Sequence, residues 1–375
     1  MDTASHREAI EAWLILLRAP KFSASCVREL VERHGGARAA LEAARRGDGV
    51  AHATTRAWLR KPDAAAIAGD LAWLAADSHQ LLTIADDDYP PLLRESAGAP
   101  AALFVAGNAG ALWQPQVAIV GSRSASQSGL ANARAFARAL AAAGLAITSG
   151  LAEGIDAAAH ETALASGIAT IAVLGTGPDI VYPTRHRELA ARIEANGALV
   201  SEFAPGTPGR RENFPRRNRI IAGLALGTLV VEAGLRSGSL ITARSASDQG
   251  RDVFAIPGSI HHPLARGCHR LIRNGATLVE DAGEIVEALR PLAARLGAAL
   301  RERLEADVPP TASQPHDRAH SRLLQALGHE PLGIDALAER TGLGAAALSA
   351  MLLELELDGE VAAERGGRYV RRAPA

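Results

Sequence analysis

The chain has 375 residues, of which 48% are hydrophobic and 22% charged, and its formal net charge is −1. This length and composition predict a soluble globular protein of two or three domains. The net charge gives no sign of a nucleic-acid partner, but residues 205–275 carry eleven arginines against four acidic residues. The chain has only two lysines, so its basic groups are almost all guanidinium groups, which suit planar contacts to phosphates and bases.

The two cysteines, Cys26 and Cys268, lie far apart and form neither a disulfide framework nor a zinc motif. A reducing cytosol is the natural setting for such a chain. No apolar stretch reaches the length of a membrane span, and the N-terminus lacks the features of a signal peptide. We therefore expect a cytoplasmic protein with no membrane partner and no bound metal.

The N-terminal part, residues 1–78, is predicted to be a small helical domain of the SAM or helix-hairpin-helix type. Apolar residues recur there at helical spacing, and the segment FSASCVRELVERHGG reads as one capped helix. Ser23 or Ser25 is its expected N-cap, and Gly35 and Gly36 are expected to end it. Such domains contact DNA backbone or protein partners, but a purely packing role is equally compatible with the pattern.

Residues 79–298 are predicted to form an α/β domain with an extended Rossmann-like, doubly wound and mostly parallel sheet. Nearly continuous apolar runs alternate with helical segments, as in sheets that are covered on both faces. The expected strands are 81–87, 102–107, 117–121, 145–150, 170–175, 198–203, 228–233, 252–258 and 276–281. Ligands of such domains bind outside the carboxyl ends of the strands.

A polar linker rich in proline and serine is expected at 299–318, followed by a winged-helix domain at 319–375. Residues 345–359 read as its third helix, and Gly366 and Gly367 as the tip of its hairpin. That helix contains Glu354 and Glu356 and no arginine or lysine, whereas a helix that reads bases should be basic or amide-rich. A protein contact or a weak backbone contact is favoured over base reading.

Four expected strands end in turns of small residues, which present backbone N–H groups and hydroxyls to anions. Their candidate phosphate-binding residues are Gly121, Ser122, Arg123, Ser149, Gly150, Gly175, Ser237, Gly238, Ser239 and Thr242. The segment FPRRNR adds Arg217, Asn218 and Arg219 beside the last of these turns. Four such turns in one domain predict an extended anion-binding surface.

The first turn, GSRSASQSG, is not a dinucleotide fingerprint, because Arg123 occupies the position of its second glycine. No Walker A pattern occurs either, so no nucleotide cofactor is expected. Asp156 and His160 have the spacing of two metal ligands on a helix, but a third ligand is not evident, and a role in the first helical turn explains Asp156. Glu232 could act as a general acid or base or hold nearby arginines, and the structural role is favoured.

These segments resemble the DNA-processing protein A family (DprA, also called Smf). The motifs that carry the resemblance are VAIVGSR, TSGLAEGIDAAAH, VLGTGPDIVYP, FPRRNRIIAGL, VVEAGLRSGSLITAR and GRDVFAIPGSI, and they cover about residues 85–285. The resemblance implies a homodimer that binds and protects single-stranded DNA and loads RecA recombinase onto it during natural transformation and homologous recombination. It implies no chemical step and no catalytic residue.

The resemblance also assigns residues. The family's GSR turn corresponds to Gly121–Arg123, with Arg123 as the expected phosphate clamp; its RNR segment corresponds to Arg217–Arg219, and its SGS turn to Ser237–Ser239. Some members place a lysine after the YP dipeptide, and Arg185 is the candidate for that role here.

Two alternatives remain at this point. Related Rossmann-like nucleoside-monophosphate phosphoribohydrolases use a strand-end nest and a glutamate, but their PGGxGT turn precedes that glutamate, whereas Glu232 precedes RSGSLIT here. A winged-helix regulator with a sensory α/β domain would rest on the tail alone. Aromatic residues make up only 3% of the chain, so DNA binding should depend on the backbone more than on base stacking, with low sequence preference and strong salt dependence.

For the homodimer, the sequence offers an apolar group near the last expected strand. Its members are Leu271, Ile272, Leu278 and Val279. For each residue taken singly, an ordinary core position is the favoured explanation.

Overall fold

The computed structural model describes residues 3–307 and, towards the C-terminus, residues 323–327, 332–344, 348, 351–352, 355, 361–364 and 368–371. The chain divides into two compact units, residues 1–300 and 301–375, and each is described by itself. None of the described helices is long and apolar enough to cross a membrane.

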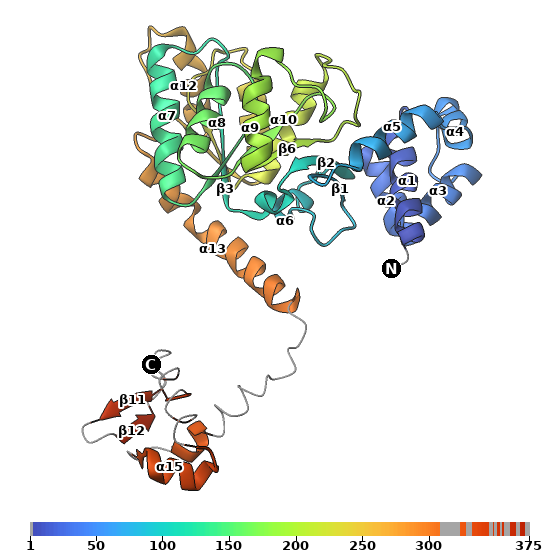
Figure 1. Cartoon of the computed structure of the whole chain (residues 1–375). Helices are drawn as coiled ribbons and strands as arrows, with labels where there is room; N and C mark the ends of the chain where they lie inside the picture. The colour runs from blue at the N-terminus through green and yellow to red at the C-terminus, as the bar shows by residue number, and fades with distance from the viewer. Residues whose placement is uncertain are drawn as a thin grey trace. The chain divides into compact units, whose positions relative to one another are not determined.

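Between residues 3 and 74, five helices form a domain that contacts the β1 end of the sheet (Figure 1). They are α1 (Thr3–Arg18), α2 (Ala24–His34), α3 (Ala37–Arg46), α4 (Ala53–Arg60) and α5 (Ala64–Leu74). The predicted capped helix is confirmed as α2: the Ser23 hydroxyl accepts the backbone N–H of Cys26 at 3.2 Å, and Gly35 ends the helix in the left-handed conformation.

Arg18, at the end of α1, fixes this helical domain to the sheet domain. Its guanidinium donates to both carboxylate oxygens of Asp70 at 2.6 Å and to the carbonyl of Pro205 at 2.8 Å. Asp70 is fully buried, so the pair is shielded from solvent and holds α1, α5 and the loop after β6 together.

Within residues 3–307, nine strands form one sheet in the order β1-β2-β6-β5-β4-β3-β7-β8-β9. They are β1 (His79–Thr83), β2 (Ala102–Gly107), β3 (Gln116–Val120), β4 (Ala146–Ser149), β5 (Thr170–Val173), β6 (Ala198–Ser201), β7 (Gly227–Val230), β8 (Asp252–Ala255) and β9 (Thr277–Leu278). Each overlaps a strand expected from the sequence. β2 pairs antiparallel with both β1 and β6, and the other pairs are parallel, which confirms the mostly parallel Rossmann-like sheet.

Helices cover both faces of the parallel part of the sheet, as Figure 1 shows. They are α7 (Gln127–Ala142), α8 (Ile155–Ala165), α9 (Arg187–Asn196), α10 (Asn213–Leu224), α11 (Ser239–Asp248), α12 (Arg266–Arg273) and α13 (Ala282–Asp307). The short helix α6 (Pro91–Arg94) contacts α10. Val117 and Ile119 of β3 pack in one apolar cluster with α7, α8 and α13, whereas Ala118 and Val120 pack in another with α10, α11 and α12. The alternation of strand side chains thus gives two cores, one on each face.

The order of the strands determines where a ligand site can lie. From β3 the chain runs through β4, β5 and β6 on one side, and β7 then returns to the other side of β3. Loops after β3 and β7 therefore diverge to opposite faces and leave a crevice between them, which is where doubly wound sheets bind ligands.

α13 continues to Asp307, so residues 299–307, expected as the start of the linker, are helical. In the C-terminal unit, α15 (Ile334–Thr341) is described together with a three-stranded sheet of β10 (Leu332–Gly333), β12 (Arg368–Arg371) and β11 (Val361–Glu364). The expected hairpin is present as the antiparallel pair β11–β12. Its glycine tip, Glu354 and Glu356 lie outside the described residues.

α8 carries a histidine that is completely buried. The Thr170 hydroxyl donates its one proton to the carbonyl of Ile147 at 2.7 Å. The same hydroxyl oxygen must therefore accept from Nδ1 of His160, which also lies at 2.7 Å. The proton of the neutral imidazole ring is thus on Nδ1. Burial lowers the pKa of His160 to about 3, and the charges of Arg217 and His186 act in the same direction. His160 is therefore a neutral core residue, and no group of three or more metal-ligating side chains exists among the described residues.

This burial predicts acid sensitivity. Between about pH 6.5 and about 3 the unfolded chain binds a proton at His160 that the folded chain does not, so the free energy of unfolding falls as the pH is lowered. The loss at this site should be about 2 kcal/mol at pH 5. We expect His160→Gln to be less stable than the wild type at pH 7.5 and to approach it at pH 5 in thermal unfolding; parallel pH profiles of the two proteins would contradict this account.

Candidate functional site

A cavity of about 790 Å³ lies at the carboxyl ends of β3 and β7. Three segments that are far apart in the sequence line it: residues 120–124 after β3, residues 211–221 around the start of α10, and residues 234–242 after β7. Nine of the predicted residues are among its lining residues: Gly121, Ser122, Arg123, Arg217, Asn218, Ser237, Gly238, Ser239 and Thr242. The cavity therefore occupies the crevice that the strand order creates.

Arg217 lies at the bottom of this cavity, and its side chain is buried. It is only 4% exposed, and its guanidinium donates to the carbonyls of Gly150, at 2.8 Å, and Val173. Its Nε donates to the side-chain oxygen of Asn218 at 3.2 Å. Arg217 thus ties the carboxyl ends of β4 and β5 to α10, a role that the sequence did not indicate.

A buried carboxylate compensates part of this charge. Asp156 in α8 accepts backbone N–H groups of Gly150 at 3.1 Å and Ala152 at 3.3 Å. Burial raises the pKa of Asp156, an effect that Arg217 and these amides oppose. Burial lowers the pKa of Arg217 to about 10, so the guanidinium remains charged at neutral pH. Asp156 thus binds the loop after β4, whereas His160 binds Thr170.

Two glycines allow the strand-end loops to pack this closely. A Cβ atom at Gly150 would lie 2.5 Å from Nη2 of Arg217, and one at Gly154 would lie 2.3 Å from the carbonyl oxygen of Ser122. Gly154 also has a φ of +76°, which residues with side chains rarely adopt. The loops after β3 and β4 therefore touch through their backbones.

The SGS turn, Ser237–Ser239, lines the cavity and is fixed there by side-chain hydrogen bonds. The hydroxyls of Ser237 and Ser239 lie 2.7 Å apart, and the side-chain amide of Asn218 donates to the carbonyl of Gly238 at 3.2 Å. α11 begins at Ser239, so its first N–H groups lie at the cavity, where a helix N-terminus favours an anion.

The outer wall carries exposed cations and an aromatic pair. Arg123, Arg211 and Arg236 are exposed, and their guanidinium groups form no ion pair with a described residue. The Arg123 guanidinium lies 5.8 Å from the ring centre of Phe214, and that ring lies 5.3 Å from the ring of Tyr182. Sequence reasoning missed Tyr182 and Phe214 as site residues, although both lie inside the motifs that we used, in the YP and FPRRNR segments.

Five predicted residues do not line this cavity: Ser149, Gly150, Gly175, Arg185 and Arg219. Gly150 lines a small adjoining pocket with Arg123 and Phe214. The buried Ser149 hydroxyl donates to the carbonyl of Ile119, the Gly175 carbonyl accepts from Asn213, and Arg185 pairs with Glu153.

Arg219 lies on the opposite side of α10 from Arg217, because residues two apart on a helix do not share a face. Its Nη2 donates to Glu202 at 2.6 Å. The sequence grouped Arg217, Asn218 and Arg219 in one anion-binding nest. In the structure Arg217 and Asn218 line the cavity, whereas Arg219 does not.

Glu232, the candidate acid or base, is bound by a helix N-terminus. Its two carboxylate oxygens accept the backbone N–H of Ser126 at 2.9 Å and the Ser126 hydroxyl at 2.5 Å, where α7 begins. It does not line the cavity. The geometry agrees with the favoured structural role, although the partner is Ser126 and not an arginine.

Comparison with known proteins places the chain in a family. The family model described as DNA recombination-mediator protein A matches residues 80–290. Over 306 residues the chain is 46% identical to Protein Smf of Escherichia coli K12, which covers 81% of this chain and 80% of that protein. The chain belongs to the DNA recombination-mediator protein A family.

Other members support this assignment. DNA processing protein DprA of Streptococcus pneumoniae is 48% identical over 54% of this chain and 72% of its own length. Its X-ray structure matches with a TM-score of 0.68, covering 74% of this chain and 97% of that chain. A Helicobacter pylori DprA structure, described for its single-stranded DNA binding mode, matches with a TM-score of 0.51 and 28% identity, over 56% of this chain and 96% of that chain. The DprA winged-helix model matches residues 307–367, in agreement with the expected C-terminal domain.

The contacts of Arg217 generate a prediction about stability. Arg217→Ala leaves two carbonyls unpaired and removes the charge that opposes the raised pKa of Asp156, so the free energy of unfolding should fall by about 3 kcal/mol. Arg123→Ala, at an exposed position beside the same cavity, should change it by less than about 0.5 kcal/mol. Thermal unfolding of both variants measures the difference; equal midpoints would show that Arg217 is not the structural residue of the pair.

Proposed function

We propose that the cavity at the ends of β3 and β7 binds the sugar-phosphate backbone of single-stranded DNA. The protein would protect the strand and load RecA onto it in natural transformation and homologous recombination, without a chemical step. The observation that carries this proposal is the imbalance of charge: Arg123, Arg211, Arg217 and Arg236 line the cavity, and the only acidic residue among its lining residues is the buried Asp156.

The donors are suited to phosphates. The SGS turn and the start of α11 supply backbone N–H groups and hydroxyls, and the exposed arginines supply charged forks that match phosphate oxygens. Arg217 contributes its charge from below without needing to touch the ligand. Such contacts distinguish poorly between base sequences, so binding should be sequence-tolerant.

The aromatic pair changes one expectation from the sequence. Although aromatic residues are scarce in the chain, Tyr182 is 50% exposed and lies against Phe214 at the edge of the cavity. An unstacked base of the bound strand can stack on the Tyr182 ring, as bases do on aromatic side chains of many single-strand binding proteins. We therefore propose backbone contacts as the main source of affinity, with one stacking position beside them.

The hydrolase alternative has no support at this site. Glu232 does not line the cavity, and both of its carboxylate oxygens accept from Ser126. The one acidic residue among the cavity's lining residues is Asp156, which accepts two backbone N–H groups. The handover to RecA is proposed from the family alone.

Arg123→Ala tests the DNA proposal. We expect weaker binding to oligonucleotides of every sequence, and the salt slope, d log K/d log[salt], should decrease by about 0.7 for each phosphate that the variant no longer binds. Stimulation of RecA-dependent strand exchange should fall in parallel. Arg138→Ala, an exposed position on α7 outside the cavity, is the matched control and should behave like the wild type. An Arg123→Ala variant that is folded and binds with unchanged affinity and slope would exclude this cavity as the DNA site.

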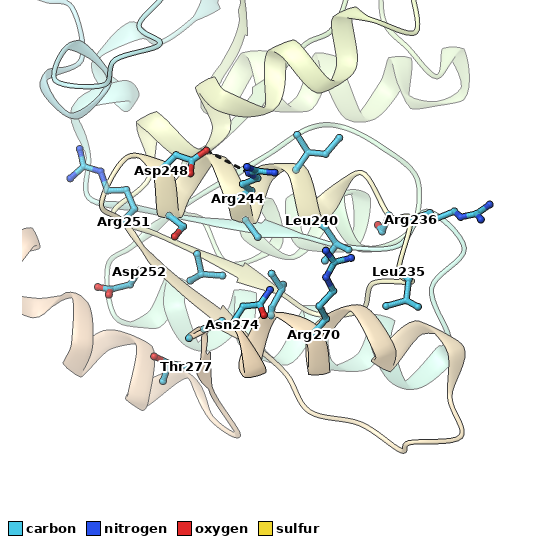
Figure 2. A pocket seen from close by; sticks show the side chains of 18 residues that line it. Leu235, Arg236, Leu240, Arg244, Asp248, Arg251, Asp252, Arg270, Asn274 and Thr277 are labelled. Atoms are coloured by element: carbon cyan, nitrogen blue, oxygen red, sulfur yellow. Dashed lines mark ion pairs between the residues drawn. The ribbon is translucent and has the colours of Figure 1, made fainter.

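We also propose a homodimer formed through the α11–α12 face and the β9 edge of the sheet. A hollow of about 760 Å³ lies there. Figure 2 shows its lining side chains, among them Leu235, Leu240 and Arg270, and the ion pair of Arg244 with Asp248. Leu235 and Ile241 line this hollow, and Leu278 follows Thr277, which also lines it; the three side chains are 50%, 41% and 44% exposed.

Of the four residues expected for this contact, Leu278 alone is largely exposed. Val279 is completely buried, and Leu271 and Ile272 pack against the core. Leu278→Asp should therefore reduce the mass measured by light scattering to that of a monomer without lowering the unfolding temperature. A wild type that is monomeric at micromolar concentrations would disprove the dimer.

A further inference from the structure

A second groove, of about 900 Å³, lies between the helical domain and the sheet domain within the first unit. One wall is the end of α1, the turn to α2 and the start of α2; the other is the loop after β6 and the start of α10. The family resemblance assigns only one residue of this groove, Arg219, and none of its lining residues also lines the cavity at β3 and β7.

The groove is strongly basic. Six cationic residues line it, against a single acidic residue, Glu202; they are Arg18, Lys21, Arg28, Arg210, Arg216 and Arg219. The Glu202 side chain is only 3% exposed, and its Oε2 is bound by Arg216 at 3.2 Å and Arg219 at 2.6 Å. Its charge is therefore neutralised inside the wall.

Several of these cations have unused bonding capacity. Lys21, Arg28 and Arg210 form no hydrogen bond or ion pair through their side chains with described residues. Nη1 of Arg219 is buried without a hydrogen-bond partner among the described atoms. α2 also begins in this groove, at Ala24, and its N-terminus adds N–H groups that favour an anion. A cluster of like charges is unfavourable unless an anion compensates it, so the groove is suited to a polyanion.

α10 separates this groove from the first cavity and presents a different face to each. Phe214, Arg217, Asn218 and Ile221 line the cavity, whereas Arg216 and Arg219 line the groove. Because an α-helix has 3.6 residues per turn, the adjacent residues 216–219 (RRNR) point to different sides of α10. Just before the helix, Arg211 lines the cavity and Arg210 lines the groove, so the two sites meet at the N-terminal end of α10.

We propose that a single DNA strand bound in the cavity continues past the N-terminal end of α10 into this groove, where Lys21, Arg28, Arg210 and Arg216 contact its phosphates. The helical domain is then part of the DNA-binding surface. This inference rests on the proposed function, because the occupant of the groove is the continuation of the same strand. Phe203, 5.5 Å from the Arg216 guanidinium, keeps that side chain against the wall of the groove.

The test is a double charge reversal in the helical domain, Lys21→Glu with Arg28→Glu. Binding of short oligonucleotides of about 6 nucleotides, which fill the first cavity, should not change, whereas affinity for strands of about 20 nucleotides should fall by about tenfold or more. The salt slope for the long strand should decrease by about 1.4, the value for two phosphate contacts. The two side chains form no hydrogen bond or ion pair with the residues that the structure describes, so the unfolding temperature should not change.

Arg56→Glu with Arg60→Glu is the matched control, because both residues are exposed on α4, in the same domain but outside the groove, and the change in charge is identical. If both double variants lose affinity for the long strand, the loss results from the change in net charge and not from contacts in the groove, and the inference is overturned. Wild-type affinity of the Lys21/Arg28 variant for both lengths would also overturn it, while leaving the cavity as the DNA site. If the Arg123→Ala variant binds short strands as well as the wild type does, the proposed function itself fails.

Discussion

The buried guanidinium of Arg217 is the interaction on which the site depends. It binds carbonyls at the ends of β4 and β5 from a helix that lies between β6 and β7 in the sequence, and it is electrostatically coupled to Asp156 in α8. The carboxyl ends of these two strands are thereby fixed relative to α10. Because the charge is retained, the same group that organises the loops also gives the cavity a positive potential. The Arg217 side chain therefore has both a structural and an electrostatic role.

The order of the strands explains why the remaining ligand groups converge. β3 and β7 are neighbours in the sheet although more than a hundred residues separate them in the sequence, and each is followed by a turn of small residues. Glu232, directly after β7, binds the N-terminus of the helix that follows β3, which fixes the two turns across the crevice. An anion-binding surface then requires no dedicated domain; it follows from loops that the sheet already brings together.

Much of this arrangement was predictable. Apolar runs gave the strands, and turn chemistry gave Gly121, Ser122, Arg123 and the SGS turn, because backbone nests depend on local sequence. Long-range packing was not predictable: burial of Arg217 depends on carbonyls of two distant strands, and the separation of Arg219 from it depends on which face of α10 meets the sheet. The aromatic pair was missed for the same reason, since Tyr182 and Phe214 meet only after folding.

The placement of α10 between two basic surfaces has a further consequence. The cavity and the groove differ chemically: one has a serine-rich turn and an aromatic pair, the other a dispersed set of cations with Glu202 in its wall. A nucleic-acid strand has a 5′ and a 3′ end, and a path through two unlike sites is not symmetric under reversal of the strand. A strand bound along it would therefore be held in one orientation, and each protein molecule would present a defined end to whatever follows it on the DNA.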